Sequence, residues 1–197
     1  MVTNEQIKNL REQTGVSVMQ CKKALEEAKG DIEKAILILR KKSGDIAAKK
    51  KDRTLGAGVI SSYIHSNAGV GALVELLSET DFVSGNEEFR KIAHDLAMHI
   101  TAASPEFLAR ADISENELKK VSELFAEEIK GNPKGKSAAI SEKILKGKID
   151  AYFKERVLLE QSFIKNLDLT IQDLLDGAIQ KFGEKIAIGR FSRFSIK

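Results

Sequence analysis

The spacing of hydrophobic residues changes at Gly56, and this change restricts the fold more than any other feature of the sequence. Up to residue 43, apolar residues recur every three or four positions, as they do in amphipathic helices. Residues 59–65 and 70–77 are instead rich in strand-forming residues, and the turn-forming segment Ser66-Asn67-Ala68-Gly69 separates them, which predicts a β-hairpin. Helical spacing returns after residue 86. The sequence therefore predicts an α+β protein.

Residues 1–43 are predicted to form three short helices. Gly15 and Gly30 suit the ends of the first two helices, and Asp31 suits the N-cap of the third. About 40 residues can form only a small bundle, which is marginally stable by itself. The apolar positions of the three helices are Ile7, Leu10, Val18, Cys21, Ala24, Leu25, Ala28, Ile32, Ala35, Ile36 and Leu39.

Residues 44–55 are predicted as a basic linker to a core domain over residues 56–197. In this domain Asn86 is expected to cap a long helix that follows the hairpin. Residues 186–196 predict a closing strand, and the mixed parity of its apolar residues predicts a bulge at Gly189. A three-stranded antiparallel sheet leaves edges and apolar faces exposed, which favours a partner chain or a second copy of the protein. Further helices are predicted within residues 114–125, 140–153 and 170–179.

The composition limits the cellular location. Cys21 is the only cysteine, so no intramolecular disulfide can form and a reducing compartment is expected. Residues 1–13 lack the apolar core of a secretory signal. The apolar runs are too short to span a membrane. We therefore expect a cytoplasmic protein without a membrane partner.

Positive charge is concentrated near the N-terminus, where residues 1–54 hold 13 Lys and Arg against 8 Asp and Glu. One interpretation is an RNA-binding segment at residues 41–53. No aromatic residue interleaves these lysines, as a stacking platform for bases would require. A solvated basic helix or linker is therefore favoured, and no direct contact with nucleic acid is expected.

No residue pattern predicts catalysis, a cofactor or a metal site. Residues 131–137 are one residue short of a phosphate-binding loop and follow a helical segment instead of the required strand, so they predict a helix-to-helix loop. Of the three histidines, His94 and His99 lie about 140° apart around a helix and cannot share a ligand. An enzyme is therefore the weakest hypothesis.

Thr80-Asp81-Phe82-Val83 lies at the corner between the predicted second strand and the long helix. As an isolated pattern, it indicates a helix cap followed by a core aromatic residue. A large aromatic residue beside an acidic one at such a corner is also typical of a protruding contact for a partner. The residues themselves leave both interpretations open.

Four motifs occur in order over nearly the whole chain. They are Leu10-Arg11-Glu12-x-Thr14-Gly15 continued by Cys21-Lys22-Lys23-Ala24-Leu25 and Gly30-Asp31, then Thr80-Asp81-Phe82-Val83 with Asn86, then Leu158-Leu159-Glu160-Gln161-x-Phe163, and last Gly183-Glu184-Lys185-Ile186. Together they resemble the elongation factor Ts family. Ser17, Gln20 and Ser162 depart from the family pattern, which often has glycine, aspartate and proline there.

This resemblance implies a protein that binds elongation factor Tu, in its GDP-bound and nucleotide-free forms, and promotes GDP release without covalent chemistry. It implies that Thr80-Asp81-Phe82-Val83 wedges near the Mg²⁺ and phosphate site of Tu, with Phe82 as the wedge and Asp81 as an orienting contact. His65 is a second candidate contact. Residues 1–43 resemble a ubiquitin-associated-like domain that adds docking surface. The single hairpin unit resembles the short form of the family, which implies a homodimer.

Two hypotheses outside this family stay open. A helical adaptor would use residues 1–43 to bind another protein and would not change nucleotide release. An RNA-binding protein would use residues 41–53, and its affinity for RNA would fall steeply as the salt concentration rises.

Overall fold

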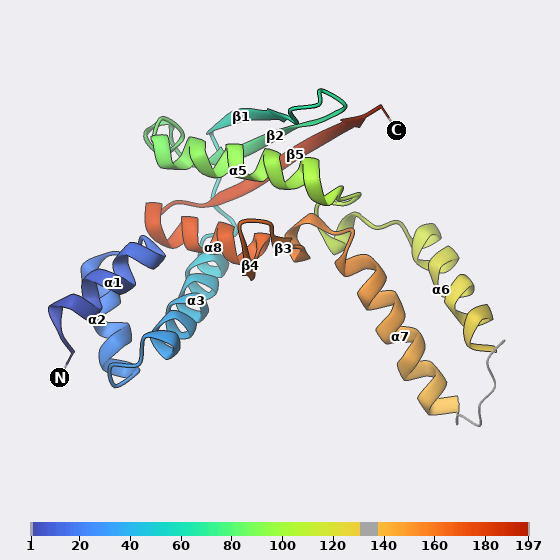
Figure 1. Ribbon diagram of the computed structural model, residues 1–197, viewed down its shortest axis with the longest axis horizontal. Helices are drawn as coiled ribbons and strands as arrows, with labels where there is room; N and C mark the ends of the chain where they lie inside the picture. The colour runs from blue at the N-terminus through green and yellow to red at the C-terminus, as the bar shows by residue number, and fades with distance from the viewer. Residues whose placement is uncertain (1, 131–137, 197) are drawn as a thin grey trace. The chain divides into compact units, whose positions relative to one another are not determined.

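The computed structural model describes residues 2–130 and 138–196, which form two compact units (Figure 1). One unit combines Met1–Thr101 with Gln172–Lys197, and the other is Ala102–Ile171. Helices and a three-stranded antiparallel sheet are both present, so the predicted α+β class is confirmed. The loop predicted at residues 131–137 lies outside the described residues.

The first unit begins with the three predicted helices, α1 (Asn4–Thr14), α2 (Val18–Glu27) and α3 (Ile32–Lys49). Gly15 and Gly30 have φ angles of +66° and +86°, which glycine adopts without the steric cost of a side chain. Asp31 caps α3 by accepting a hydrogen bond from the Lys34 N–H at 3.0 Å. The buried core of these helices consists of Leu10, Val16, Cys21, Ala24, Leu25, Ala28, Ala35 and Leu39.

Helix α3 is longer than predicted, because it continues through Ser43 and Gly44 to Lys49. The boundary predicted at residue 43 therefore lies inside a helix, and the first half of the predicted linker is helical. Ser43 explains part of this extension, since it is buried and its hydroxyl donates to the Arg40 carbonyl at 2.7 Å. A single glycine costs a helix about 1 kcal/mol, which packing of this kind offsets.

Replacing Gly44 by alanine is expected to stabilise the protein. A Cβ atom at this position would lie 3.6 Å from Asp176 Oδ2, which is an ordinary contact, and alanine has the better helix propensity by about 0.5–1 kcal/mol. Urea unfolding should show the gain. The matched control is Gly15→Ala, which should destabilise by about 1–2 kcal/mol because its φ is positive. Equal stability of the two variants would contradict this account.

The sheet has the strand order β1 (Ala57–Ile64), β2 (Val70–Ser78) and β5 (Ile186–Ser195), all antiparallel. The predicted hairpin and closing strand are thus confirmed. Val74 pairs with Phe191, whereas Leu76 pairs with Ile188, so β5 carries an extra residue. This bulge is at the predicted position.

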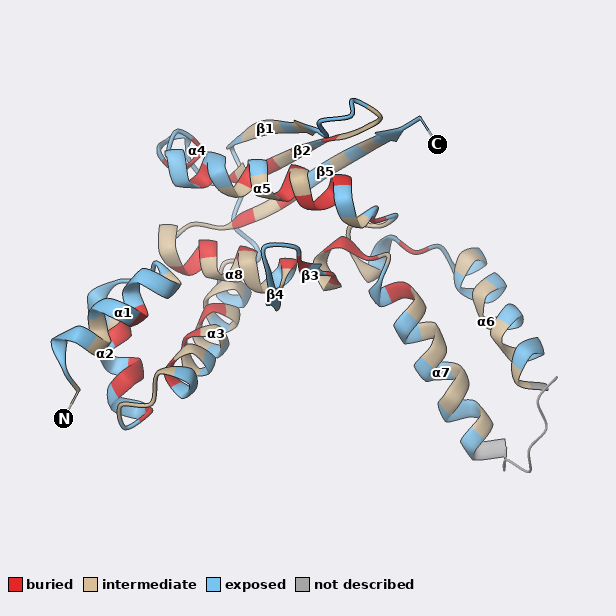
Figure 2. Ribbon diagram, in the orientation of Figure 1, coloured by how far each residue is buried: buried red, intermediate tan, exposed pale blue. Residues whose placement is uncertain are grey.

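Helix α5 (Glu87–Ala103) lies along one face of the sheet, and α8 (Ile171–Phe182) lies on the other side of α5 (Figure 1). Asn86 caps α5, as predicted, by accepting from the Glu88 N–H at 2.8 Å. The Phe89 and Phe182 rings pack edge to face at 6.0 Å and join the two helices. Figure 2 shows a buried stripe along α5. Its members are Phe89, Ala93, Leu96, Ala97, His99, Ile100 and Thr101.

The second unit is built on two helices, α6 (Glu115–Lys130) and α7 (Ala138–Lys154). Ser114 and Glu117 form the predicted capping box, with each side chain accepting from the backbone N–H of the other. A short hairpin of β3 (Ser162–Phe163) and β4 (Asn166–Thr170) was not predicted, because strands of two and five residues are too short to stand out in the sequence. Within residues 2–130 and 138–196, no helix combines the length and hydropathy needed to cross a membrane.

An ion pair links the two ends of the second unit. The Arg110 guanidinium donates to both carboxylate oxygens of Glu160 at 2.7 and 2.8 Å, and its Nη2 also donates to the Asp150 carbonyl. These bonds hold the pKa of Glu160 below its usual value. Two parallel bonds of this kind are stronger than an ordinary surface pair.

Replacing Glu160 by glutamine is expected to destabilise the second unit by about 1 kcal/mol at pH 7, because one charge-assisted bond is lost. The folded-state pKa of Glu160 is lowered, so the stabilisation is present above the unfolded-state pKa of about 4.3 and is lost as the pH falls through the folded-state value. Urea unfolding at several pH values should therefore show that the free energies of unfolding of the wild type and Glu160→Gln become equal at acidic pH. Glu123→Gln, in an exposed pair with Lys119, is the control and should have little effect.

Candidate functional site

The corner between β2 and α4 (Asp81–Ser84) holds the predicted partner-binding residues. The short helix is closed by the Gly85 N–H, which donates to the Asp81 carbonyl at 2.7 Å. Phe82 is 88 % exposed, more than any other large hydrophobic residue among those described, whereas Val83 is 8 % exposed and belongs to the core. At this corner Val83 therefore anchors the short helix in the core, and Phe82 is exposed to solvent.

The two polar residues of the corner have different roles. Asp81 is exposed, and within the described part of the chain its carboxylate forms no hydrogen bond or ion pair. It is therefore available to a partner. Thr80 occupies the N-cap position of α4, but its side chain makes no capping bond. Its hydroxyl and its backbone N–H instead donate to the carboxylate of Glu184, at 2.5 and 3.0 Å.

A group of five residues, which we call the corner clamp, holds this segment. It consists of Arg53, Glu79, Thr80, Glu184 and Lys185. The Glu79 carboxylate accepts from the Lys185 backbone N–H at 2.5 Å and from Arg53 Nη1 at 3.0 Å. These two donors, the Lys185 N–H first, hold the pKa of Glu79 below its usual value. Glu79 and Thr80, the two residues before α4, are thus both fixed by hydrogen bonds that involve side chains.

Three distant segments of the chain meet at the corner clamp. Lys185 Nζ donates to the carbonyls of Lys51 and Arg53, at 2.6 and 2.9 Å. Lys50 Nζ donates to the Gly183 carbonyl at 2.6 Å. Sequence reasoning did not assign a site role to Arg53, Glu79 or Glu184. The available signal was the Gly183-Glu184-Lys185-Ile186 motif, which the fold brings to the Thr80 corner.

His65 does not join the corner. It is exposed and follows the far end of β1, where Ile64 pairs with Gly71, whereas Ser78 pairs with Ala57 at the other end. A strand of this length places about 25 Å between the two ends. The His65 Nδ1 lies 3.5 Å from the Tyr63 hydroxyl. A separate contact through His65 stays a prediction.

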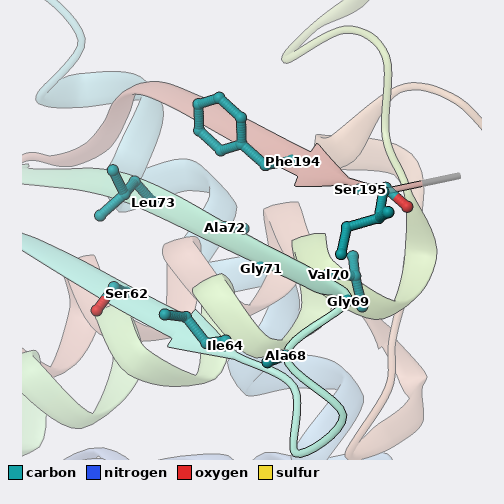
Figure 3. A pocket seen from close by; sticks show the side chains of 11 residues that line it. Ser62, Ile64, Ala68, Gly69, Val70, Gly71, Ala72, Leu73, Phe194 and Ser195 are labelled. Atoms are coloured by element: carbon teal, nitrogen blue, oxygen red, sulfur yellow. The ribbon is translucent and has the colours of Figure 1, made fainter.

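The face of the sheet opposite α5, here called the outer face, is apolar and exposed. Ile64 and Phe194 flank Gly71 across three adjacent strands, and the missing side chain between them leaves a groove of 540 Å³ (Figure 3). An ion pair of Glu75 with Arg190, at 2.7 Å, lies on the same face. The exposed apolar residues here are Ile60, Ile64, Leu73, Phe194 and Ile196.

The described residues form no group of three or more His, Cys, Asp and Glu side chains that could hold a metal ion. The four charged residues of the corner clamp are engaged with one another, with Thr80 or with backbone groups. What the corner offers is an exposed aromatic side chain beside an unpaired carboxylate. This arrangement is suited to binding another macromolecule.

Comparison with known proteins agrees with the four motifs. A protein-family model described as Elongation factor TS matches residues 2–196. The chain is 47 % identical to an elongation factor Ts of Carboxydothermus hydrogenoformans, covering all of this chain and 89 % of that protein. It is 43 % identical to the Thermosipho melanesiensis protein of the same name, covering all of this chain and 99 % of the relative. The chain belongs to the elongation factor Ts family of translation factors.

Proposed function

We propose that this protein binds elongation factor Tu carrying GDP and accelerates release of the nucleotide, acting as a guanine nucleotide exchange factor in the cytoplasm. The observation that carries the proposal is the 88 % exposure of Phe82 on a corner where hydrogen bonds hold Glu79 and Thr80 in place. Leaving a phenylalanine in water has a free-energy cost that a partner pocket recovers on binding.

Phe82 acts as a wedge that enters Tu near its Mg²⁺ and phosphate site, and Asp81 orients the corner on Tu. The three-helix module of residues 1–43, as a ubiquitin-associated-like domain, adds docking surface, and His65 contributes a second contact. No bond is made or broken, so the protein needs no catalytic residue or cofactor of its own. If it binds nucleotide-free Tu more tightly than the GDP complex, it must weaken GDP binding by the same factor.

The proposal includes a homodimer formed through the outer face of the sheet. The outer face carries two exposed side chains, Ile64 and Phe194, on either side of the groove at Gly71. This surface can pair with the same surface of a second copy about a two-fold axis. Apolar patches of this kind mark interaction sites. The Glu75–Arg190 pair carries no net charge, so it adds no net charge repulsion between two copies.

The RNA-binding alternative is less well supported by the contacts of the basic segment. Lys50 and Arg53 are used within the chain, on the Gly183 carbonyl and the Glu79 carboxylate. The adaptor alternative does not account for the exposed Phe82, which lies outside the three-helix module.

The test is the release of fluorescent GDP from a bacterial elongation factor Tu, with and without the protein. Strong acceleration supports the proposal. Binding to an active Tu without acceleration favours the adaptor. Salt-sensitive binding to RNA, together with no binding to Tu, favours the RNA-binding protein. Each of these last two outcomes overturns exchange as the function.

A further inference from the structure

We propose that Glu184 is a positioning residue for nucleotide exchange, which fixes the direction of Phe82 by holding Thr80. Glu184 lies 102 positions after Phe82 in the chain and does not belong to the exposed contact itself. The inference rests on the proposed exchange function and assigns a role to a residue outside the Thr80-Asp81-Phe82-Val83 motif.

The short helix that carries Phe82 cannot hold its own direction. Helix α4 has four residues, and a single helical turn is unstable by itself because its nucleation is unfavourable. Its first residues also lack an N-cap bond from the Thr80 side chain. The structure supplies the missing support from outside the helix, through the carboxylate of Glu184.

One attachment on each side of Phe82 sets the direction of its side chain. On one side, Thr80 donates two hydrogen bonds to Glu184, so both its backbone and its side chain are fixed. On the other side, Val83 is buried in the core of the first unit. Phe82 has no comparable attachment of its own. The direction of its side chain therefore depends on the residues before and after it.

Glu184 is itself held on a braced turn. It follows Gly183, whose φ of +72° ends α8 and whose carbonyl accepts from Lys50. It precedes Lys185, whose N–H binds Glu79 and whose ammonium group binds the backbone of residues 51 and 53. A carboxylate on such a turn holds a fixed position at little entropic cost when it binds Thr80.

The variants that test the proposal separate hydrogen bonding from charge. Glu184→Ala removes both acceptors. Glu184→Gln keeps two bonds, since its amide oxygen can accept from the Thr80 N–H while its amide nitrogen donates to the Thr80 hydroxyl. Thr80→Val and Thr80→Ser form a second pair, in which only serine keeps the hydroxyl. All four are compared in the full-length protein.

The first readout is GDP release from elongation factor Tu at increasing concentrations of each variant. For Thr80→Val, which loses one charge-assisted hydrogen bond, the maximal release rate is expected to fall about tenfold, while the half-saturating concentration changes less. Glu184→Ala loses both bonds, and its maximal rate should fall at least about tenfold. Glu184→Gln and Thr80→Ser should stay close to the wild type. A general loss of structure would not be rescued by these conservative replacements. Wild-type rates in Glu184→Ala would overturn the proposal.

The second readout is backbone hydrogen exchange, which does not depend on Tu. In Glu184→Ala, the amides of Thr80, Ser84 and Gly85 are expected to exchange at least about tenfold faster, while those of β2 keep their protection. Unchanged exchange at the corner would overturn the positioning role even if GDP release is slowed. If the wild type fails to accelerate GDP release but corner exchange rises in Glu184→Ala, the proposed exchange function fails, and the role of Glu184 in holding the corner is retained.

Discussion

Replacing Phe82 by alanine is expected to reduce the acceleration of GDP release at least about thirtyfold. A central aromatic anchor typically contributes about 2 kcal/mol or more to a contact, and Phe82 is the most exposed large hydrophobic residue among those described. Because the side chain is in solvent, its removal should change the free energy of unfolding by less than about 0.5 kcal/mol. Release of fluorescent GDP and urea unfolding, measured on the same sample, separate the two effects.

The control for Phe82→Ala is Leu167→Ala in the second unit. Leu167 is 73 % exposed and lies in β4, outside the Thr80-Asp81-Phe82-Val83 segment, so its removal tests for a general effect of losing an exposed apolar side chain. It should leave GDP release unchanged. If Phe82→Ala accelerated release as well as the wild type does, the exchange function would stand and the wedge would have to be sought elsewhere. Val83→Ala, in contrast, should lower stability, because Val83 is buried.

Replacing Phe194 by glutamate is expected to convert the proposed homodimer into monomers, raising the dimer dissociation constant at least about a hundredfold. The new carboxylate would be buried against apolar side chains, which costs several kcal/mol. A two-fold interface carries the substitution twice, so the cost is doubled. The monomer should still fold, since Phe194 is 68 % exposed and pairs with Gly71, which leaves room beside it. Sedimentation equilibrium over a range of concentrations measures the change.

Leu167→Glu is the matched control for this second experiment. It places the same charge on an equally exposed apolar position outside the sheet, and the dimer should persist. A wild-type protein that sediments as a monomer at micromolar concentration would overturn the homodimer. A dimer that survives Phe194→Glu would show that the two copies meet through another surface.

The helices and the main sheet could be predicted because their signals are local. The stripe from Phe89 to Ile100 and the glycines that end α1 and α2 act within a few residues, so spacing alone placed these elements. The extension of α3 past Gly44 was missed because a glycine after a serine is read as a break. The burial of Ser43, which helps α3 to continue through Gly44, arises only from tertiary packing.

The candidate site could be predicted only in part. The sequence identified the corner but could not show which of its two hydrophobic residues is in the core, since both suit either place. The structure assigns Val83 to the core and Phe82 to solvent. The contacts of Glu79 with Lys185 and of Thr80 with Glu184 join positions 106 and 104 apart in the chain. No local pattern carries a pairing over that distance.

The extra residue in β5 has a consequence for how this protein could change through insertion and deletion. Ile188 and Phe191 pair with Leu76 and Val74 and lie on the same face of the sheet, although three positions separate them, because the bulge takes up one residue. Deleting Gly189 would restore regular alternation and leave Phe194 on the outer face. The strand can therefore lose one residue at the bulge without changing which side chains its later residues present to the outer face, whereas the loss of a residue between Phe191 and Phe194 would turn Phe194 toward α5.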